Sequence, residues 1–320
     1  MNDVLKFLSK SLRPFGYHIR PVRGKNMLHV PNVSYEPSIA NLVKTQGRTF
    51  GNFTPYLDDM TVYLRTCLRE NRNVDARPRV SRASVSDTAF VCIRSLVQAI
   101  NAAKDKGDLR LVVMDDHSDP HLLDRIRNIA ADAEVPVEVI ALSKQGQGAS
   151  LYAQFDHARQ HARGLCYFVE DDYLHEPDAI DKIWGFMRHI AQTCRCHAVI
   201  YPQEHRVLYR DHYPSLIIEG EDRHWRTMRH ATHTLALHSE IVRDQWDKFE
   251  NTKYVGDPKL RQEGSEAKTT DRLFESIPGF SPLRPLAVHL QFEGTLPPLY
   301  DWTPLWQSYA DKEIGQKHDS

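Results

Sequence analysis

Strand-like segments alternate with helix-like segments between residues 60 and 170, and this alternation restricts the possible folds most strongly. The strand-like segments, which either alternate in polarity or are continuously apolar, are residues 60–64, 109–114, 135–141 and 165–169. The segments with apolar residues at helical spacing are residues 90–100, 121–133 and 149–162. This order predicts an α/β protein whose mostly parallel central sheet carries helices on both faces.

Residues beyond 172 have a weaker pattern and predict a mixed half. The expected helices are residues 179–190, a stretch that starts near Ser239, and residues 270–276. The expected strands are residues 198–201, 230–237 and 286–290. The tail from Pro297 carries aromatic residues among prolines, and we expect it to wrap the surface. The chain is therefore divided into residues 1–58, 59–175, 176–296 and 297–320.

Residues 1–25 are basic and amphipathic. They contain six Lys or Arg residues and one acid, and their apolar residues would share one face of a helix. Such a helix can lie on an anionic membrane surface, or it can pack on its own domain. We therefore expect a cytoplasmic protein that is either free or held at the inner face of the cytoplasmic membrane.

The composition argues against several classes of protein. With 41 Lys and Arg against 42 Asp and Glu, the net charge of −1 argues against a nucleic-acid partner. The sequence has no apolar run of the roughly 18 residues that a membrane span needs, and no signal-peptide pattern. Its five cysteines are odd in number and lie mostly in apolar segments, which is typical of reduced cysteines in a cytosol.

Two acidic clusters follow two of the predicted strands. Asp115-Asp116-His117-Ser118-Asp119 follows one strand, and Glu170-Asp171-Asp172 follows another. The carboxyl ends of parallel strands meet at one edge of a sheet, where ligands bind. Neighbouring carboxylates repel one another unless a cation or hydrogen-bond donors compensate. A Mg²⁺ or Mn²⁺ ion on a diphosphate would do so, and the alternative is that each cluster is a solvated turn.

Three segments together resemble the nucleotide-binding half of family 2 glycosyltransferases with the GT-A fold. Residues 112–119 (VVMDDHSD) resemble a strand and its Asp-Asp-Gly-Ser-like motif. Residues 144–149 (KQGQGA) resemble a glycine-containing loop, and residues 167–172 (YFVEDD) resemble the strand with the Asp-x-Asp metal motif. The resemblance implies a Rossmann-like GT-A fold that binds a nucleotide-sugar, with a UDP-sugar favoured, and uses Mn²⁺ or Mg²⁺.

The resemblance also implies roles for single residues. Asp116 would accept a hydrogen bond from the base, with Asp115 supporting it, and Asp172 would bind the metal. The other residues implied to contact the nucleotide-sugar are Thr66, Gly148, Glu170 and Asp171. His117 departs from the family pattern because it stands where glycine is usual. Glu170 departs as well, because it stands where Asp is commoner.

In the resembled family, transfer inverts the anomeric centre and the general base starts a helix in the acceptor half. Asp271, in the segment TTDRLF, matches that position, and Glu221 and Asp222 are its rivals. His289 ends the last predicted strand, where it either completes the metal shell or forms a hydrogen bond in the core.

Three further groups of residues suggest other sites. His230, His233 and His238 fall on a predicted strand whose alternation points the first two to opposite faces, which argues against a shared metal. The Cys194-x-Cys196-His197 segment lacks the paired spacing of a zinc site. A final cluster either lines an acceptor groove or forms a solvated loop, and it comprises Trp225, Arg223, Arg226 and Arg229.

The resulting hypothesis is a metal-dependent inverting glycosyltransferase that acts on a hydroxyl of a glycan or lipid-linked glycan, as in polysaccharide biosynthesis. Two alternatives remain. A sugar-1-phosphate nucleotidyltransferase shares the sheet, but its first strand is usually followed by a glycine-rich loop, and residues 65–71 contain no glycine. A non-catalytic nucleotide-sugar-binding protein is the other. Dehydrogenases, P-loop NTPases and α/β-hydrolases are excluded because their glycine-containing motifs do not occur in the sequence.

Overall fold

A computed structural model of the chain describes residues 14, 33–35, 53, 56–70, 79–204, 206–209 and 215–315. Apart from Pro14, the basic segment predicted over residues 1–25 lies outside the described residues, as does most of the lead-in to residue 58. No helix in the described part of the chain is both long enough and apolar enough to cross a membrane.

The core of the fold is one mostly parallel sheet, in the spatial order β1-β8-β9-β11-β7-β10-β5-β2-β3-β4. Its strands are β1 (Val33–Tyr35), β2 (Asp59–Thr66), β3 (Asp108–Asp115), β4 (Val137–Ala141), β5 (Leu165–Glu170), β7 (Val199–Ile200), β8 (Ser215–Glu219), β9 (His224–Met228), β10 (Leu235–His238) and β11 (Gly279–Leu283). In the first half, β2 pairs in parallel with β3 and β5, and β3 pairs in parallel with β4. The predicted parallel sheet is confirmed.

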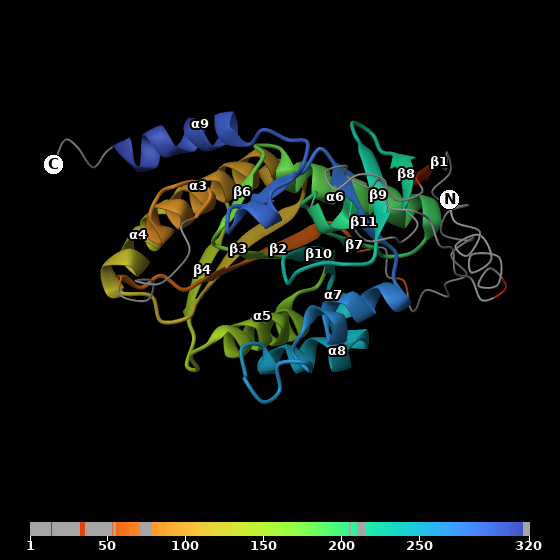
Figure 1. Ribbon diagram of the computed structural model, residues 1–320, viewed down its shortest axis with the longest axis horizontal. Coiled ribbons are helices and arrows are strands. Elements are labelled where there is room, and N and C mark those ends of the chain that lie inside the picture. Colours follow the sequence, from red (N-terminus) through yellow and green to blue (C-terminus); the bar gives the residue numbers. More distant parts are fainter. Residues whose placement is uncertain are drawn as a thin grey trace, which may run out of the picture.

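Helices cover both faces of this sheet, as predicted (Figure 1). On one face lie α3 (Val85–Ala103), α4 (Pro120–Ala130) and α6 (Ala179–Cys194). On the other lie α5 (Gln147–His161), α7 (Ser239–Asp244) and α8 (Trp246–Glu250). The central strand β2 is buried along its whole length because both faces are covered. Its Val62 packs in the core on the α3 face, and the neighbouring Tyr63 packs on the α5 face.

The mixed half adds strands that the sequence pattern did not predict, namely β8, β9 and β11. Trp225 on β9 is fully buried and its ring stacks on Phe186 of α6, with 3.8 Å between ring centroids. The expectation that Trp225 lines a groove or a solvated loop was therefore wrong. A single buried aromatic residue in a short polar strand carries too little periodicity to reveal the strand.

The strand predicted over residues 230–237 was placed too early, since β10 begins at Leu235. Residues 230–234 leave the sheet because their polar groups bond to neighbouring elements. The backbone N–H of Ala231 donates to Asp271, and the hydroxyl of Thr232 lies 3.1 Å from that of Tyr173. His230 and His233 precede β10 and are not part of a strand. Strand alternation therefore does not determine the directions of their side chains, as the sequence-based prediction assumed.

Two smaller features complete the fold. β6 (Tyr173–His175) directly follows the second acidic cluster in the chain. It forms a separate antiparallel pair with β12 (Ala287–His289). The tail, expected to wrap the surface, contains the helix α9 (Thr303–Glu313), whose Trp306 and Tyr309 are buried against residues of α3. The two halves of the chain share the sheet, because β5 pairs directly with β10.

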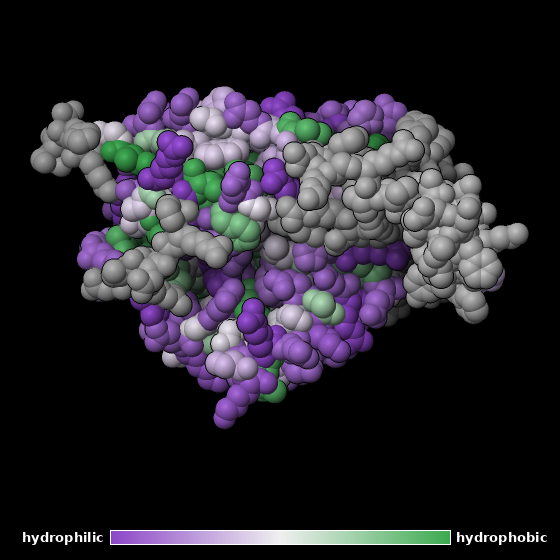
Figure 2. Space-filling model, viewed as in Figure 1, coloured by the Kyte–Doolittle hydropathy of each residue, from purple (hydrophilic) through white to green (hydrophobic). Residues whose placement is uncertain are grey.

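The described residues on the face seen in Figure 2 are mainly hydrophilic, and the hydrophobic residues among them form small separate patches. The described large hydrophobic residues that are exposed are Tyr56, Leu260, Phe292 and Leu299.

Candidate active site

Both acidic clusters contact the chain where β2 ends. The backbone carbonyl of Thr66 accepts a hydrogen bond of 2.8 Å from the N–H of Asp116, which belongs to the cluster after β3. The N–H of Cys67 donates to Oδ2 of Asp171, in the cluster after β5, at 3.1 Å. The two clusters therefore lie on either side of one short stretch of backbone, as expected for neighbouring strands of a parallel sheet.

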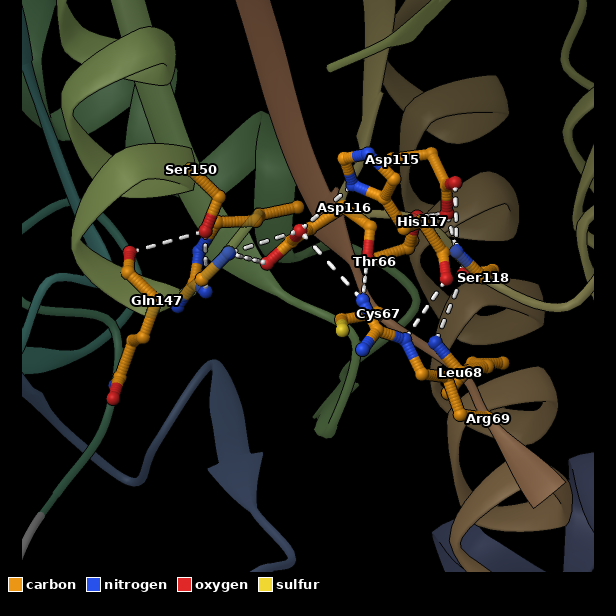
Figure 3. Close-up of polar contacts among 12 residues, drawn as sticks. Thr66, Cys67, Leu68, Arg69, Asp115, Asp116, His117, Ser118, Gln147 and Ser150 are labelled. Carbon is orange, nitrogen blue, oxygen red and sulfur yellow. Dashed lines mark hydrogen bonds and ion pairs between the residues drawn. The ribbon is translucent and has the colours of Figure 1, made fainter. Parts of the chain in front are cut away.

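Asp115 holds the turn after β3 in shape (Figure 3). Its carboxylate accepts a hydrogen bond of 2.9 Å from the hydroxyl of Thr66 and one of 3.0 Å from the N–H of Ser118. The turn places His117 in the left-handed region, with φ of 59°. His117 thus adopts the backbone conformation that favours glycine, even though its side chain departs from the family pattern.

Asp116 joins this turn to the loop before α5 (Figure 3). Its side chain is almost completely buried, and Oδ2 accepts a hydrogen bond of 3.0 Å from the N–H of Gly146. Nδ1 of His117 lies 3.2 Å from Oδ1 of Asp116, and the guanidinium of Arg69 lies 3.9 Å from it. Gly146 has φ of 116°, a backbone conformation that favours glycine at this point of the loop.

Gly148 lies in the first turn of α5, where space is limited. A Cβ at this position would lie 2.4 Å from the carbonyl oxygen of Lys253 and 2.7 Å from that of Val255. The absence of a side chain therefore lets α5 pack against the segment that follows α8.

Glu170 and Asp171 are both held by groups on or near β2. Glu170 forms an ion pair with Arg65, whose guanidinium also donates to the hydroxyl of Ser150 at 3.2 Å. Burial raises the pKa of the Asp171 carboxyl to about 7, and the nearby charge of Asp172 adds to this. The N–H of Cys67 and the charge of Arg65 oppose the shift without cancelling it.

Asp172 is the charged centre of the second cluster. Its Oδ2 lies 2.8 Å from the guanidinium of Arg79, and its Oδ1 lies 3.2 Å from Nε2 of His289. Burial acts to raise the pKa of Asp172, but the positive charges of His289, Arg79 and Arg65 outweigh burial and lower that pKa to about 2. Burial would also lower the pKa of His289, but the negative charge of Asp172 raises it overall.

Glu170, Asp172 and His289 could together hold a divalent cation. One ligand atom from each lies within 4.8 Å of the others. The ring of His289 is fixed in place by stacking on Tyr173, with 4.4 Å between ring centroids and 14° between planes. Two carboxylates and one imidazole form a donor set that suits a divalent cation. The sequence left two interpretations of His289 open, a metal ligand or a hydrogen-bonded core residue. Its position beside Asp172 is compatible with a metal ligand.

A second group of potential ligands lies at the opposite edge of the sheet, where His238 pairs with Leu165 at the start of β5. The rings of His197 and His238 are stacked in parallel, 4.0 Å apart. Nδ1 of His238 accepts the N–H of Glu240 at 3.2 Å, and its Nε2 donates to the carbonyl of Tyr56 at 2.9 Å. Both nitrogens of His238 are thus used within the protein, and a metal cannot lie in the planes of two parallel rings at once.

Asp271 lies in a short 3-10 helix, Thr270–Glu275. Its Oδ1 accepts the N–H of Ala231 at 3.1 Å, and its Oδ2 lies 3.1 Å from Nδ1 of His230. Thr232, which follows Ala231 in the chain, contacts Tyr173, the neighbour of Asp172. A short bonded path therefore connects Asp271 to the residues around Asp172.

The rival candidates for the base lie in the turn between β8 and β9. Oδ2 of Asp222 lies 3.2 Å from the ammonium group of Lys182 on α6. This pairing directs Asp222 toward a helix on the α3 face. Glu221, the neighbouring rival, is exposed.

Sequence reasoning missed the basic residues of this site. Arg65 and Arg69 flank the end of β2 and contact Glu170 and the turn after β3, respectively. Their position at the end of a predicted strand is a signal that could have identified them. Arg79 lies in a polar stretch before α3 and had no such signal.

Residues 88–248, half of the chain, match the family described as glycosyl transferase family 2. The chain belongs to this family. The protein is therefore a glycosyltransferase with an α/β fold of the GT-A type, a type that commonly uses a divalent metal. No curated protein sequence matches this glycosyltransferase.

Several solved structures are similar to this glycosyltransferase at low identity. TarS of S. aureus is 12% identical, with a TM-score of 0.43 over 70% of this chain and 36% of TarS. The mannosyltransferase PcManGT from Pyrobaculum calidifontis, solved with GDP-Man and Mn²⁺, is 12% identical, with a TM-score of 0.44 over 88% of this chain and 71% of its own. A UDP-glucose pyrophosphorylase is 9% identical, with a TM-score of 0.41 over 81% of this chain and 99% of its own. The match thus spans about a third of TarS.

Proposed function

We propose that this glycosyltransferase moves a hexosyl or N-acetylhexosaminyl residue from a nucleoside-diphosphate sugar to a hydroxyl of a glycan or lipid-linked glycan, with inversion at the anomeric carbon. A UDP-sugar is the favoured donor, and the reaction depends on Mn²⁺ or Mg²⁺. The observation that carries the proposal is that the clusters after β3 and β5 both bond to the end of β2, one at Thr66 and the other at Cys67. One ligand with a base at one end and a diphosphate at the other would contact both clusters.

In this proposal, the residues after β3 bind the nucleoside part of the donor. Asp116 accepts a hydrogen bond from the base, while Asp115 and Thr66 hold the turn that presents it. Asp116 is already fixed by the N–H of Gly146, so little ordering is needed when the base binds. Asp171 and Glu170 contact the ribose or a water on the metal, and Gly148 positions the loop by letting α5 pack closely.

Asp172, His289 and Glu170 would hold the divalent cation. When bound, the cation supplies positive charge that stabilises the diphosphate as it leaves. The imidazole of His289 favours Mn²⁺ over Mg²⁺, because Mg²⁺ strongly prefers oxygen ligands.

Asp271 acts as the general base. The acceptor oxygen forms a bond to the anomeric carbon while the bond from that carbon to the diphosphate oxygen breaks, and the hydroxyl proton moves to Asp271. Attack from the side opposite the leaving group inverts the configuration. The N–H of Ala231 and the ring of His230 hold the carboxylate of Asp271 in one orientation.

We also propose a cellular location for the protein, in the cytoplasm and at the inner face of the cytoplasmic membrane. A lipid-linked acceptor would suit an N-terminal segment that contacts the membrane, and residues 1–25 remain the candidate for that contact. Polysaccharide biosynthesis in the cytoplasm is the corresponding process. Membership of family 2 supports sugar transfer over nucleotidyl transfer, and the intact acids Asp171 and Asp172 favour a catalyst over a non-catalytic binder.

Hydrolysis of a panel of UDP- and GDP-sugars, with and without Mn²⁺, tests this function. We expect slow release of one nucleoside diphosphate that requires the metal, and a product whose anomeric configuration by NMR is opposite to that of the donor. Release of inorganic pyrophosphate from a nucleoside triphosphate and a sugar phosphate would instead identify a nucleotidyltransferase. The absence of turnover despite tight donor binding would identify a binding protein.

A further inference from the structure

Arg79 lies against the carboxylate of Asp172. The distance between its guanidinium and Oδ2 is 2.8 Å, and both side chains are largely buried. His289 faces the other oxygen of the same carboxylate. Both oxygens of the proposed metal ligand therefore face cationic or imidazole groups of the protein itself.

The backbone that carries Arg79 is anchored. Its carbonyl accepts the N–H of Arg82 at 2.9 Å, and Val80 and Ala83 pack on the hydrophobic cluster that α3 shares with α9. The next residue, Ser84, caps α3 by accepting the N–H of Asp87. The guanidinium of Arg79 thus extends from an anchored segment and contacts Asp172 from the side of α3.

The charges around Asp172 show what this contact does. Glu170 has its own partner in Arg65, so Arg79 is not needed to neutralise that residue. Arg79 instead neutralises Asp172, the residue proposed to bind the cation. A guanidinium and a divalent cation compete for the same carboxylate oxygens, and a guanidinium also binds phosphate oxygens through two parallel hydrogen bonds.

We propose that Arg79 is a further residue of the transfer reaction: it occupies the carboxylate of Asp172 in the free protein and binds the diphosphate of the donor when the cation takes its place. The inference rests on the proposed function. Arg79 would keep the acidic cluster neutral before the donor arrives. In the complex it would add positive charge to the leaving group. The free protein would then bind the cation weakly, and the cation and the nucleoside diphosphate would bind cooperatively.

The test is direct measurement of binding, without turnover. Free Mn²⁺ is followed by electron paramagnetic resonance during titration of the wild-type chain and of Arg79→Ala. Binding of UDP, with GDP in parallel, is measured by calorimetry in saturating Mn²⁺. Loss of one charge-assisted contact predicts that Arg79→Ala binds Mn²⁺ about tenfold more tightly and binds the nucleoside diphosphate about tenfold more weakly.

Two further variants serve as controls. Arg82→Ala removes an exposed arginine from the same segment, and we expect it to leave both affinities within about twofold of wild type. Arg79→Lys keeps the charge but loses the planar fork, so its Mn²⁺ affinity should lie between those of wild type and Arg79→Ala, with nucleotide binding several-fold weaker than wild type. If Arg79→Ala does not fold, the lysine variant decides the question.

The outcomes separate the two proposals. Unchanged Mn²⁺ affinity, or unchanged nucleotide affinity, in the variants at position 79 would overturn the role of Arg79 while leaving the proposed function intact. A wild-type chain that binds neither UDP nor GDP in Mn²⁺ would overturn the proposed function, and the role of Arg79 would fall with it.

Discussion

The carboxylate of Asp116 accepts the backbone N–H of Gly146 at 3.0 Å, and this bond joins the turn after β3 to the loop that starts α5. The bond fixes one wall of the proposed nucleoside site before any ligand binds. The same loop continues into Gly148, where α5 meets the segment after α8. The position of this wall therefore depends on how closely α5 packs.

Gly148→Ala should destabilise the protein. The new Cβ would meet two backbone carbonyls at less than 3 Å, and such overpacking costs about 1–3 kcal/mol. Urea unfolding measures the change. Gly185→Ala in α6 is the matched control, because its Cβ would meet no atom within 4 Å. The control should stabilise the helix by up to about 1 kcal/mol, and an equal effect of both substitutions would contradict the packing role of Gly148.

Asp271→Asn should preserve donor binding and slow sugar transfer by about a hundredfold or more, because an amide cannot accept the proton of the acceptor hydroxyl. Calorimetry with UDP and a steady-state assay separate the two effects. Asp222→Asn removes the charge of a rival acid and should leave turnover close to that of the wild type. Near-normal turnover in Asp271→Asn would remove Asp271 from the mechanism.

Glu204 should make stability depend on pH. Burial raises its pKa to about 7, and the charge of Arg226 only partly opposes this. The folded state therefore favours the protonated form. The contribution of Glu204 to the free energy of unfolding is fully present below the unfolded pKa of about 4.3. It is lost as the pH rises through about 7, which lowers the free energy of unfolding by up to roughly 4 kcal/mol.

Urea unfolding at pH 5 and pH 8 tests this dependence. Glu204→Gln should be less sensitive to the rise in pH than wild type, whereas Glu219→Gln, at an exposed position on β8, should show the wild-type loss. Equal loss of stability in the wild type and in Glu204→Gln would show that another group is responsible.

The first half of the fold and the placement of the acids in the candidate site could be predicted from the sequence because their signals are local. Buried parallel strands are apolar runs, and the acids after β3 and β5 follow those runs directly. The basic partners were harder to find. Arg79 reaches Asp172 from 93 positions away, and no periodicity connects the two. Likewise, β8 and β9 are short and partly polar, so only tertiary packing such as that of Trp225 on Phe186 identifies them as strands.

The central claim is that the acids after β3 and β5 bind the two ends of one nucleoside diphosphate: those after β3 bind the nucleoside, and those after β5 hold the cation on the diphosphate. The Tm measured by thermal unfolding with UDP or GDP, in Mn²⁺ or in EDTA, tests this claim. The proteins compared are the wild type, Asp172→Ala and the control Asp105→Ala, which changes an exposed residue. We predict that one nucleoside diphosphate raises the Tm of wild type and of Asp105→Ala by roughly 5 °C in Mn²⁺, with no rise in EDTA and none in Asp172→Ala. The same rise in EDTA, or in Asp172→Ala, would contradict the account.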